Sequence, residues 1–150
     1  MTDDPMETNR PILSGWKPIN PPRALNIWER AMIKHLTTDP LPHHDMIERQ
    51  LSFAWVTHEL ASDPSVRIEV HRNPDDRIPG ISNTSLYWAL SYIEGRDVDG
   101  MYMWAILKAG DGYIEMLEVQ RADGSLFAHL PSPKKFLLMS EDDPADIGTQ

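Results

Sequence analysis

The first pattern that could bind a metal ion is Asp97-x-Asp99-Gly100, because carboxylate oxygens are preferred calcium ligands. A helix–loop–helix calcium loop, however, needs a further oxygen ligand before the glycine and a glutamate at its end. Here glycine follows the second aspartate directly, and Met101 comes next. Because Asp-Gly favours tight turns, the pattern predicts a hairpin turn, and no metal ligand is assigned.

Glu115 and Glu118 could form a general acid–base pair. On a strand, residues three positions apart face opposite sides unless a bulge intervenes, so exposed or salt-bridged strand residues are the preferred interpretation. The six histidines lack the H-E-x-x-H spacing of a zinc site, and the neighbours His43 and His44 would diverge on a helix. The histidines are His35, His43, His44, His58, His71 and His129.

Signatures of nucleophilic catalysis and phosphate binding are also missing. Ser14 and Ser125 lack the surroundings of a nucleophile elbow, and Gly110-Asp-Gly112 leads into a strand rather than a helix. The chain has no cysteine, which excludes disulfides and thiolate chemistry. The sequence therefore predicts no catalytic residue, no metal and no cofactor, and leans against an enzyme.

Two helices are expected in the first half. Asn26 and Glu29 have the spacing of a capping box, and Trp28, Met32 and Leu36 repeat at four-residue steps, which predicts a helix over 27–36. A second helix is predicted over 43–52. The stretch 53–58 could extend it, but its aromatic and β-branched residues favour a strand. A strand at 66–70 and a loop at 73–80 follow.

Asp-Gly pairs at 99–100, 111–112 and 123–124 recur every twelve residues between apolar runs, which is the strongest local sign of hairpins. They predict strands over 86–94, 101–108, 113–121 and 125–130, and an irregular segment or edge strand over 131–139. The fold predicted is α+β, with two N-terminal helices packed on an antiparallel β-meander of 4–6 strands.

Hairpin loops of two or four residues would place even positions of 86–94 beside odd positions after Gly100. One face would then carry Leu86, Trp88, Leu90 and Tyr92 with Met101, Met103, Ala105 and Leu107. A change of apolar phase predicts a bulge near Met116-Leu117.

The other face would carry Tyr87, Ala89 and Ile93 with Tyr102, Trp104 and Ile106. An antiparallel sheet with one solvated face alternates more cleanly than this, so something is expected to cover the second face. The arm caps it through Ile12, Leu13 and Trp16, or a partner chain or a ligand covers it. The candidate partner-binding residues are Tyr87, Tyr102, Trp104 and Trp16.

The 150 residues and ordinary composition fit one globular domain. We expect a proline-rich arm over 1–22, a single domain over 23–139 and a disordered acidic tail over 140–150. The net charge of −9 divides into −2 over 1–10, −4 over 140–150 and −3 between them. Without a basic stripe, a signal peptide or a long apolar run, we expect a cytoplasmic protein that binds neither nucleic acid nor membrane.

The chain resembles a bacterial domain family of unknown function over about 23–133. The resemblance rests on the helix start Arg23-Ala-Leu-Asn-x-x-Glu29, on Asp97-x-Asp99-Gly100 and on Glu115-Met-Leu-Glu118 before Asp123-Gly124. The family pattern has threonine where this chain has Asn26, and lacks the proline-rich arm. It implies a helix followed by a sheet and no established activity.

Three hypotheses about function follow. The first is a non-catalytic protein-interaction or self-associating module, with immunity or defence as one setting for it, whose acidic ends would attract a basic partner. The second is an enzyme or small-molecule-binding protein with a carboxylate or histidine pocket between helices and sheet. The third is a module that depends on calcium or zinc.

Overall fold

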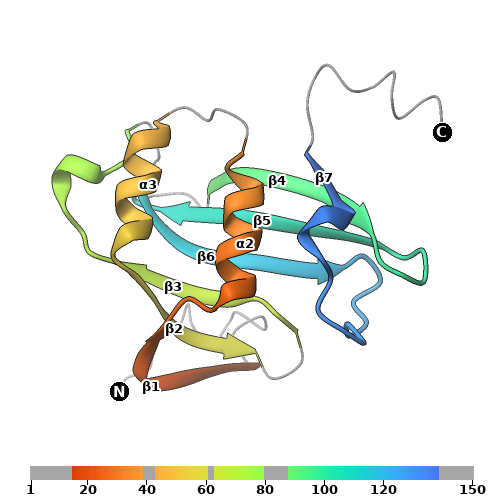
Figure 1. Ribbon diagram of the computed structural model, residues 1–150. Helices are drawn as coiled ribbons and strands as arrows, with labels where there is room; N and C mark the ends of the chain where they lie inside the picture. Colours follow the sequence, from red (N-terminus) through yellow and green to blue (C-terminus); the bar gives the residue numbers. More distant parts are fainter. Residues whose placement is uncertain (1–14, 39–42, 61–62, 80–87, 139–150) are drawn as a thin grey trace.

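The computed structural model describes residues 15–38, 43–60, 63–79 and 88–138, and within them the chain forms one antiparallel sheet and two α-helices (Figure 1). The sheet has seven strands in the order β1-β2-β3-β6-β5-β4-β7. Along the chain, the strands are β1 (Trp16–Ala24), β2 (Ala54–Leu60), β3 (Val66–Val70), β4 (Trp88–Arg96), β5 (Tyr102–Gly110), β6 (Tyr113–Arg121) and β7 (Phe136–Leu138). The fold is α+β, with β4, β5 and β6 forming a meander.

Both helices, α2 (Ile27–Leu36) and α3 (His44–Ser52), lie over the same face of this sheet (Figure 1). They do not precede the sheet as predicted, because β1 comes before α2 and β2 follows α3. Residues 16–22, predicted as part of an arm, belong to β1, which pairs with β2 at one edge of the sheet. None of the helices among the described residues is long and apolar enough to cross a membrane.

The capping box predicted at the start of α2 is confirmed. The Asn26 side chain accepts a hydrogen bond from Glu29 N at 2.7 Å, and the Glu29 carboxylate accepts one from Asn26 N at 2.9 Å. This capping box satisfies backbone donors that the first helical turn would leave unpaired. Arg23 of β1 also donates to both Glu29 oxygens, at 2.9 and 2.8 Å. Glu29 therefore holds the edge strand and the helix start together.

The stretch 53–58, for which the sequence favoured a strand over a longer helix, belongs to a strand from Ala54 onward. The helix ends at Ser52, and β2 begins at Ala54. Val56 in this strand is fully buried and pairs with Ile68 of β3. A β-branched residue placed in this way gains more from packing on a sheet than from one more helical turn.

The Asp-Gly turns reverse the chain as predicted, with Gly100, Gly112 and Gly124 all at positive φ. Asp111 and Gly112 form a two-residue loop in which both residues have positive φ, at 54° and 86°. That combination matches the twist of the flanking strands.

The strand predicted over 125–130 is not formed. The chain does turn at Gly124, but the open edge of β6 is already occupied by β3, which pairs through Val66 and Leu117. Residues 125–132 therefore leave the sheet and pass beside α2, where Trp28 Nε1 donates to Pro131 O at 2.8 Å. The expected edge strand beyond them is present as β7, which pairs with β4.

The predicted assignment of faces on β4 is wrong. Asp97 N donates to Met101 O at 2.8 Å, which leaves three residues in the loop between β4 and β5. An odd loop pairs odd with odd positions, so Ile93 lies opposite Ala105 and faces the helices. Beyond a register shift between Ala89 and Ser91, Tyr92 lies opposite Ile106 on the face away from the helices. Leu86 and Tyr87 lie outside the described residues.

The bulge predicted in β6 is present one residue earlier than Met116. Ala109 pairs with Ile114 and Lys108 with Met116, so Glu115 is the extra residue. Beyond the bulge, Leu117 and Val119 face the helices. The core lies between that face and the two helices, and its fully buried members include Met32, Leu36, Ile47, Val56, Ile93, Met103, Leu107, Leu117 and Val119.

Candidate functional site

A group of large side chains lies on the sheet face turned away from the helices, near the β4–β5 turn. We call it the outer patch and define it by residues of β4, β5 and β7. Cross-strand pairing fixes the arrangement, because Glu94 lies between Trp104 and Leu137, and Arg96 lies beside Tyr102. The members are Tyr92, Glu94, Arg96, Tyr102, Trp104 and Leu137.

Three members of the outer patch are open to solvent although they are aromatic or aliphatic. The exposed fractions are 36% for Tyr92, 53% for Tyr102 and 70% for Leu137. Aromatic side chains and arginine are the residues most enriched in protein interfaces. The exposure makes this end of the sheet the candidate site.

Contacts within the patch hold these side chains in place. The Arg96 guanidinium stacks 4.2 Å from the centre of the Tyr102 ring and donates to its hydroxyl at 2.5 Å. The Tyr92 hydroxyl donates to the Glu94 carboxylate. Partial burial, together with this hydrogen bond and the negative charge of Glu94, raises the pKa of Tyr92 to about 12. Ordered aromatic side chains lose less entropy on binding a partner.

Trp104, the next outward residue of β5 after Tyr102, is half-buried, and its Nε1 donates to Glu118 at 3.3 Å. Lys108 Nζ donates to the other Glu118 oxygen at 2.6 Å. Glu118 is 8% exposed and lies opposite Ile106, on the face away from the helices. A buried carboxylate held by a lysine and an indole is a satisfied structural group rather than a free base.

Of the four predicted partner-binding residues, the structure brings two together. Tyr102 and Trp104 share the outer face of β5. Trp16 lies on β1, four strands away, which is roughly 19 Å at the usual strand spacing. Its position opposite Leu60 on the far edge means that it cannot cap Tyr102. Tyr87, Ile12 and Leu13 lie outside the described residues.

The two aspartates of the calcium-like pattern bind an arginine of the chain. Arg121, at the end of β6, donates to Asp97 at 2.5 Å and to Asp99 at 2.6 Å. A third carboxylate, on Asp123, lies 3.9 Å from Arg121 Nε. Hydrogen bonding to Arg121 and to the Met101 N–H lowers the pKa of Asp99. The cluster joins two chain reversals, and the Arg121 guanidinium neutralises the aspartates that the calcium-like pattern would offer to a cation.

Glu115 and Glu118, considered above as an acid–base pair, do not share a pocket. Glu115, in the bulge of β6, accepts a hydrogen bond from Arg72 at 3.3 Å, while Glu118 is bound by Lys108. Neither carboxylate lies between the helices and the sheet, where apolar side chains fill the space. Within the described residues, both glutamates act in ion pairs.

The described histidines are dispersed. His35 Nε2 lies 2.9 Å from Phe136 O, His58 Nδ1 lies 2.9 Å from Thr57 Oγ1, and His44 Nε2 lies 3.6 Å from Glu48. Among the residues with described positions, no three histidine, aspartate or glutamate side chains are grouped so that they could hold a metal ion.

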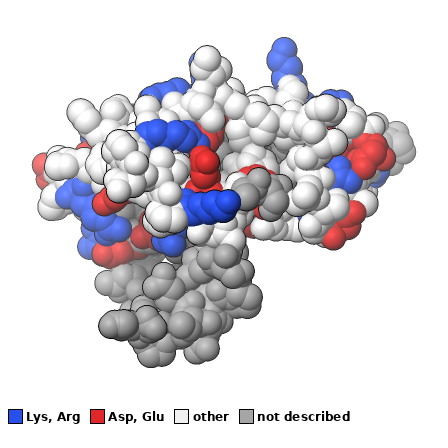
Figure 2. Space-filling view, turned by 90° about the horizontal axis from the view of Figure 1, so that it is seen from below, with Lys and Arg blue, Asp and Glu red and all other residues white. Residues whose placement is uncertain are grey.

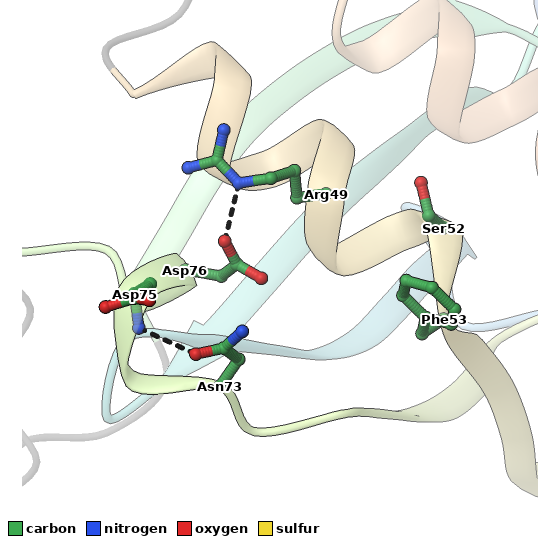
Figure 3. Close-up of a pocket in the computed structure, with 6 residues that line it drawn as sticks. All are labelled: Arg49, Ser52, Phe53, Asn73, Asp75 and Asp76. Carbon is green, nitrogen blue, oxygen red and sulfur yellow. Dashed lines mark hydrogen bonds and ion pairs between the residues drawn. The ribbon is translucent and has the colours of Figure 1, made fainter.

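A shallow hollow of about 380 Å³ lies where α3 ends against the short 3₁₀ helix Pro74–Asp76 (Figure 3). Arg49 Nε donates to Asp76 at 2.6 Å, and the backbone N–H of Asp75 donates to the Asn73 side chain at 3.0 Å. Phe53 forms another part of its wall and is 66% exposed. The carboxylates that line this hollow are those of Asp75 and Asp76, and neither Glu115, Glu118 nor a histidine is among its lining residues.

Sequence reasoning missed Glu94, Arg96 and Leu137 as members of the surface and placed Tyr92 on the wrong face. One signal was available, since Glu94 and Arg96 continue the even positions of the strand and carry charge. An even face that ends in two charged residues is an outward face. Arg121 gave no comparable signal, because Asp97 and Asp99, the carboxylates that it binds most closely, lie more than twenty residues away in the chain.

Charges of both signs are interspersed over the described part of the surface viewed in Figure 2, where Lys and Arg atoms lie next to Asp and Glu atoms at both ends. Ion pairs such as Arg23 with the buried Glu29 and Arg121 with the buried Asp97 also join charges of opposite sign. Comparison with protein family models, with curated proteins and with solved structures gave no match to this chain.

Proposed function

We propose that this chain is a non-catalytic interaction module that binds a protein partner through the outer patch. The observation that carries the proposal is the exposure of Tyr102 and Leu137 beside Arg96 on an ordered sheet face. Interfaces concentrate their binding energy in a few aromatic and arginine residues, and rigid strands present such residues accurately.

The state of the chemically capable side chains supports the same proposal. Asp97 and Asp99 are bound by Arg121, Glu118 by Lys108 and Glu115 by Arg72. Catalysis needs a base or nucleophile that can reach a substrate. In these pairs the carboxylates instead neutralise arginine and lysine, which is a structural use.

The proposed surface is a face rather than a sheet edge. Strand β1 forms one edge and contains Pro18, Pro21 and Pro22, which have no N–H to offer an added strand. At the opposite edge, β7 is three residues long. Neither edge gives a long ladder of free backbone groups, so side chains of the face would carry the binding.

Affinity capture from source cells tests the proposal with three forms of the chain. The patch variant carries Tyr102→Ser and Leu137→Ser, and the control variant carries Ile27→Ser and Phe53→Ser, two exposed apolar residues elsewhere. We expect at least one protein to be retained by the wild type and the control and reduced at least tenfold on the patch variant. Equal recovery on all three forms would contradict a role for the outer patch.

A further inference from the structure

The outer patch has a charge order that fits a second copy of the same surface. Glu94 and Arg96 are successive outward positions on β4, with Gly95 between them facing the helices. Consider two copies stacked with their outer faces together. A two-fold axis that lies midway between the two sheets, runs perpendicular to β4 and passes over Gly95 relates one copy to the other. This axis reverses the strand direction of the second copy. It therefore places Glu94 opposite Arg96 of the second copy, and Arg96 opposite Glu94.

The same operation matches the neighbouring strand. Trp104 lies in the cross-strand row of Glu94, and Tyr102 lies in the row of Arg96. The two-fold rotation therefore places Trp104 of each copy opposite Tyr102 of the other. Stacked sheets lie about 10 Å apart, a distance that facing aromatic and long charged side chains can span.

Both charged groups retain capacity for a new partner. Arg96 uses one nitrogen for Tyr102 and one for Gly100 O, at 3.3 Å, although a guanidinium has five N–H donors. Glu94 accepts from Tyr92, although a carboxylate accepts several hydrogen bonds. One charge of each sign leaves the pair neutral, so two copies of it attract rather than repel.

We infer that the partner of the outer patch is a second copy of this chain, in a two-fold dimer in which Glu94 of each copy faces Arg96 of the other. The inference rests on the proposed function and names its partner. Three strands at about 4.8 Å spacing and six residues at about 3.3 Å cover a footprint of roughly 280 Å². Standard interfaces bury about 800 Å² per partner, so the dimer is weak and forms at high concentration.

Sedimentation equilibrium of the full chain from 10 μM to 1 mM tests the inference by charge exchange. The wild type should move from 17.1 kDa towards twice that mass as concentration rises. Glu94→Arg alone would face Arg96 across the axis, and Arg96→Glu alone would face Glu94. Each single variant should therefore weaken the dimer at least tenfold. The variant carrying both changes restores opposite charges and should dimerise like the wild type.

Three outcomes would overturn the inference. A wild type that stays monomeric at 1 mM excludes the second copy. Single variants that dimerise like the wild type place the contact elsewhere. A double variant as weak as the single ones excludes the facing of Glu94 and Arg96. Circular dichroism and melting identify any variant that fails to fold, in which case Glu94→Gln and Arg96→Gln take its place, each expected to weaken the dimer.

The capture experiment separates this inference from the proposed function. If the wild type is monomeric and the patch variant still loses a captured protein, the interaction module stands and its partner is another chain. If the wild type is monomeric and capture is also unchanged, both proposals fail.

Discussion

The side-chain oxygen of Gln50 accepts a hydrogen bond from the backbone N–H of Ile114 at 2.8 Å, which links α3 to the first residues of β6. The amide nitrogen of the same side chain donates to Gly112 O at 2.9 Å and to Asp76 O at 2.7 Å. Gln50 is 1% exposed, so these three bonds replace water for groups that the helix covers.

Replacing Gln50 with leucine should therefore destabilise the domain strongly. The variant leaves the buried Ile114 N–H and the part-buried Asp76 O without their partner, while Gly112 O keeps the bond from Ile78 N, and we expect a loss of about 2–4 kcal/mol in the free energy of unfolding. Chemical denaturation measures it. Gln120→Leu, at a half-buried position on the other face, is the matched control and should change the free energy by less than about 0.5 kcal/mol. Similar losses in both variants would show that the Gln50 bonds contribute little.

The cluster of Arg121 with Asp97, Asp99 and Asp123 predicts how the free energy of unfolding depends on pH in the acid range. Hydrogen bonding to Arg121 is the main reason that the pKa of Asp99 is lowered, and Ser125 has the same effect on the pKa of Asp123. A lowered carboxyl pKa stabilises the fold above about pH 4 and loses that contribution as pH falls through the folded value. The free energy of unfolding should therefore fall between about pH 5 and pH 2.

In Arg121→Met, Asp99 loses the largest cause of its shift, so the free energy of unfolding should fall less steeply over the same interval. Arg96→Met is the control, since Arg96 binds Tyr102 and Gly100 O, and it should keep the wild-type slope. Denaturation at a series of pH values gives the slopes. An unchanged slope in Arg121→Met would show that the cluster does not govern the acid response.

Two glycines of the hairpin turns should differ in their tolerance of alanine. Both have positive φ, 89° at Gly100 and 86° at Gly112. A Cβ on Gly100 meets nothing within 4 Å, whereas one on Gly112 would lie 2.5 Å from Arg77 Cγ and 2.9 Å from Ile78 O. We expect Gly100→Ala to cost about 1–2 kcal/mol and Gly112→Ala at least about 1 kcal/mol more, measured by denaturation. Equal costs would mean that the 77–78 segment moves aside freely.

The raised pKa of Tyr92 can be followed directly. Burial, the largest cause of the shift, remains in Glu94→Gln, but the neutral amide removes the negative charge, so the pKa of Tyr92 should fall from about 12 part of the way towards the ordinary value. A raised tyrosine pKa contributes stability below about pH 10 that disappears as pH rises through the folded value. Ring NMR signals, assigned with Tyr92→Phe, report the titration. An unchanged midpoint in Glu94→Gln would leave burial as the sole cause.

The pairing of Arg23 with Glu29 should be energetically coupled. Glu29 is 3% exposed and accepts two bonds from Arg23, so a double-mutant cycle with Arg23→Met and Glu29→Gln should give about 1–2 kcal/mol of interaction energy. Arg23 also contacts the exposed Glu59 at 3.2 Å. The cycle with Glu59→Gln is the control and should give less than about 0.5 kcal/mol. A larger coupling to Glu59 would reverse this assignment.

The sequence by itself determined the features that depend on a few neighbouring residues. The capping box fixed the start of α2, because both partners lie within one helical turn. The Asp-Gly pairs marked three reversals, since glycine accepts positive φ without a clash between its side chain and the backbone. The β6 bulge followed from a change of apolar phase along one strand.

Only the tertiary structure decided which faces and partners these elements have. One residue more or fewer in the β4–β5 loop moves every side chain of β4 to the other face, and the composition of the turn is compatible with either length. The place of β3 beside β6, the binding of Arg121 to Asp97 and the reach of Gln50 to Ile114 join residues far apart in the chain. Such contacts depend on how the whole core packs, which no local pattern of residue types encodes.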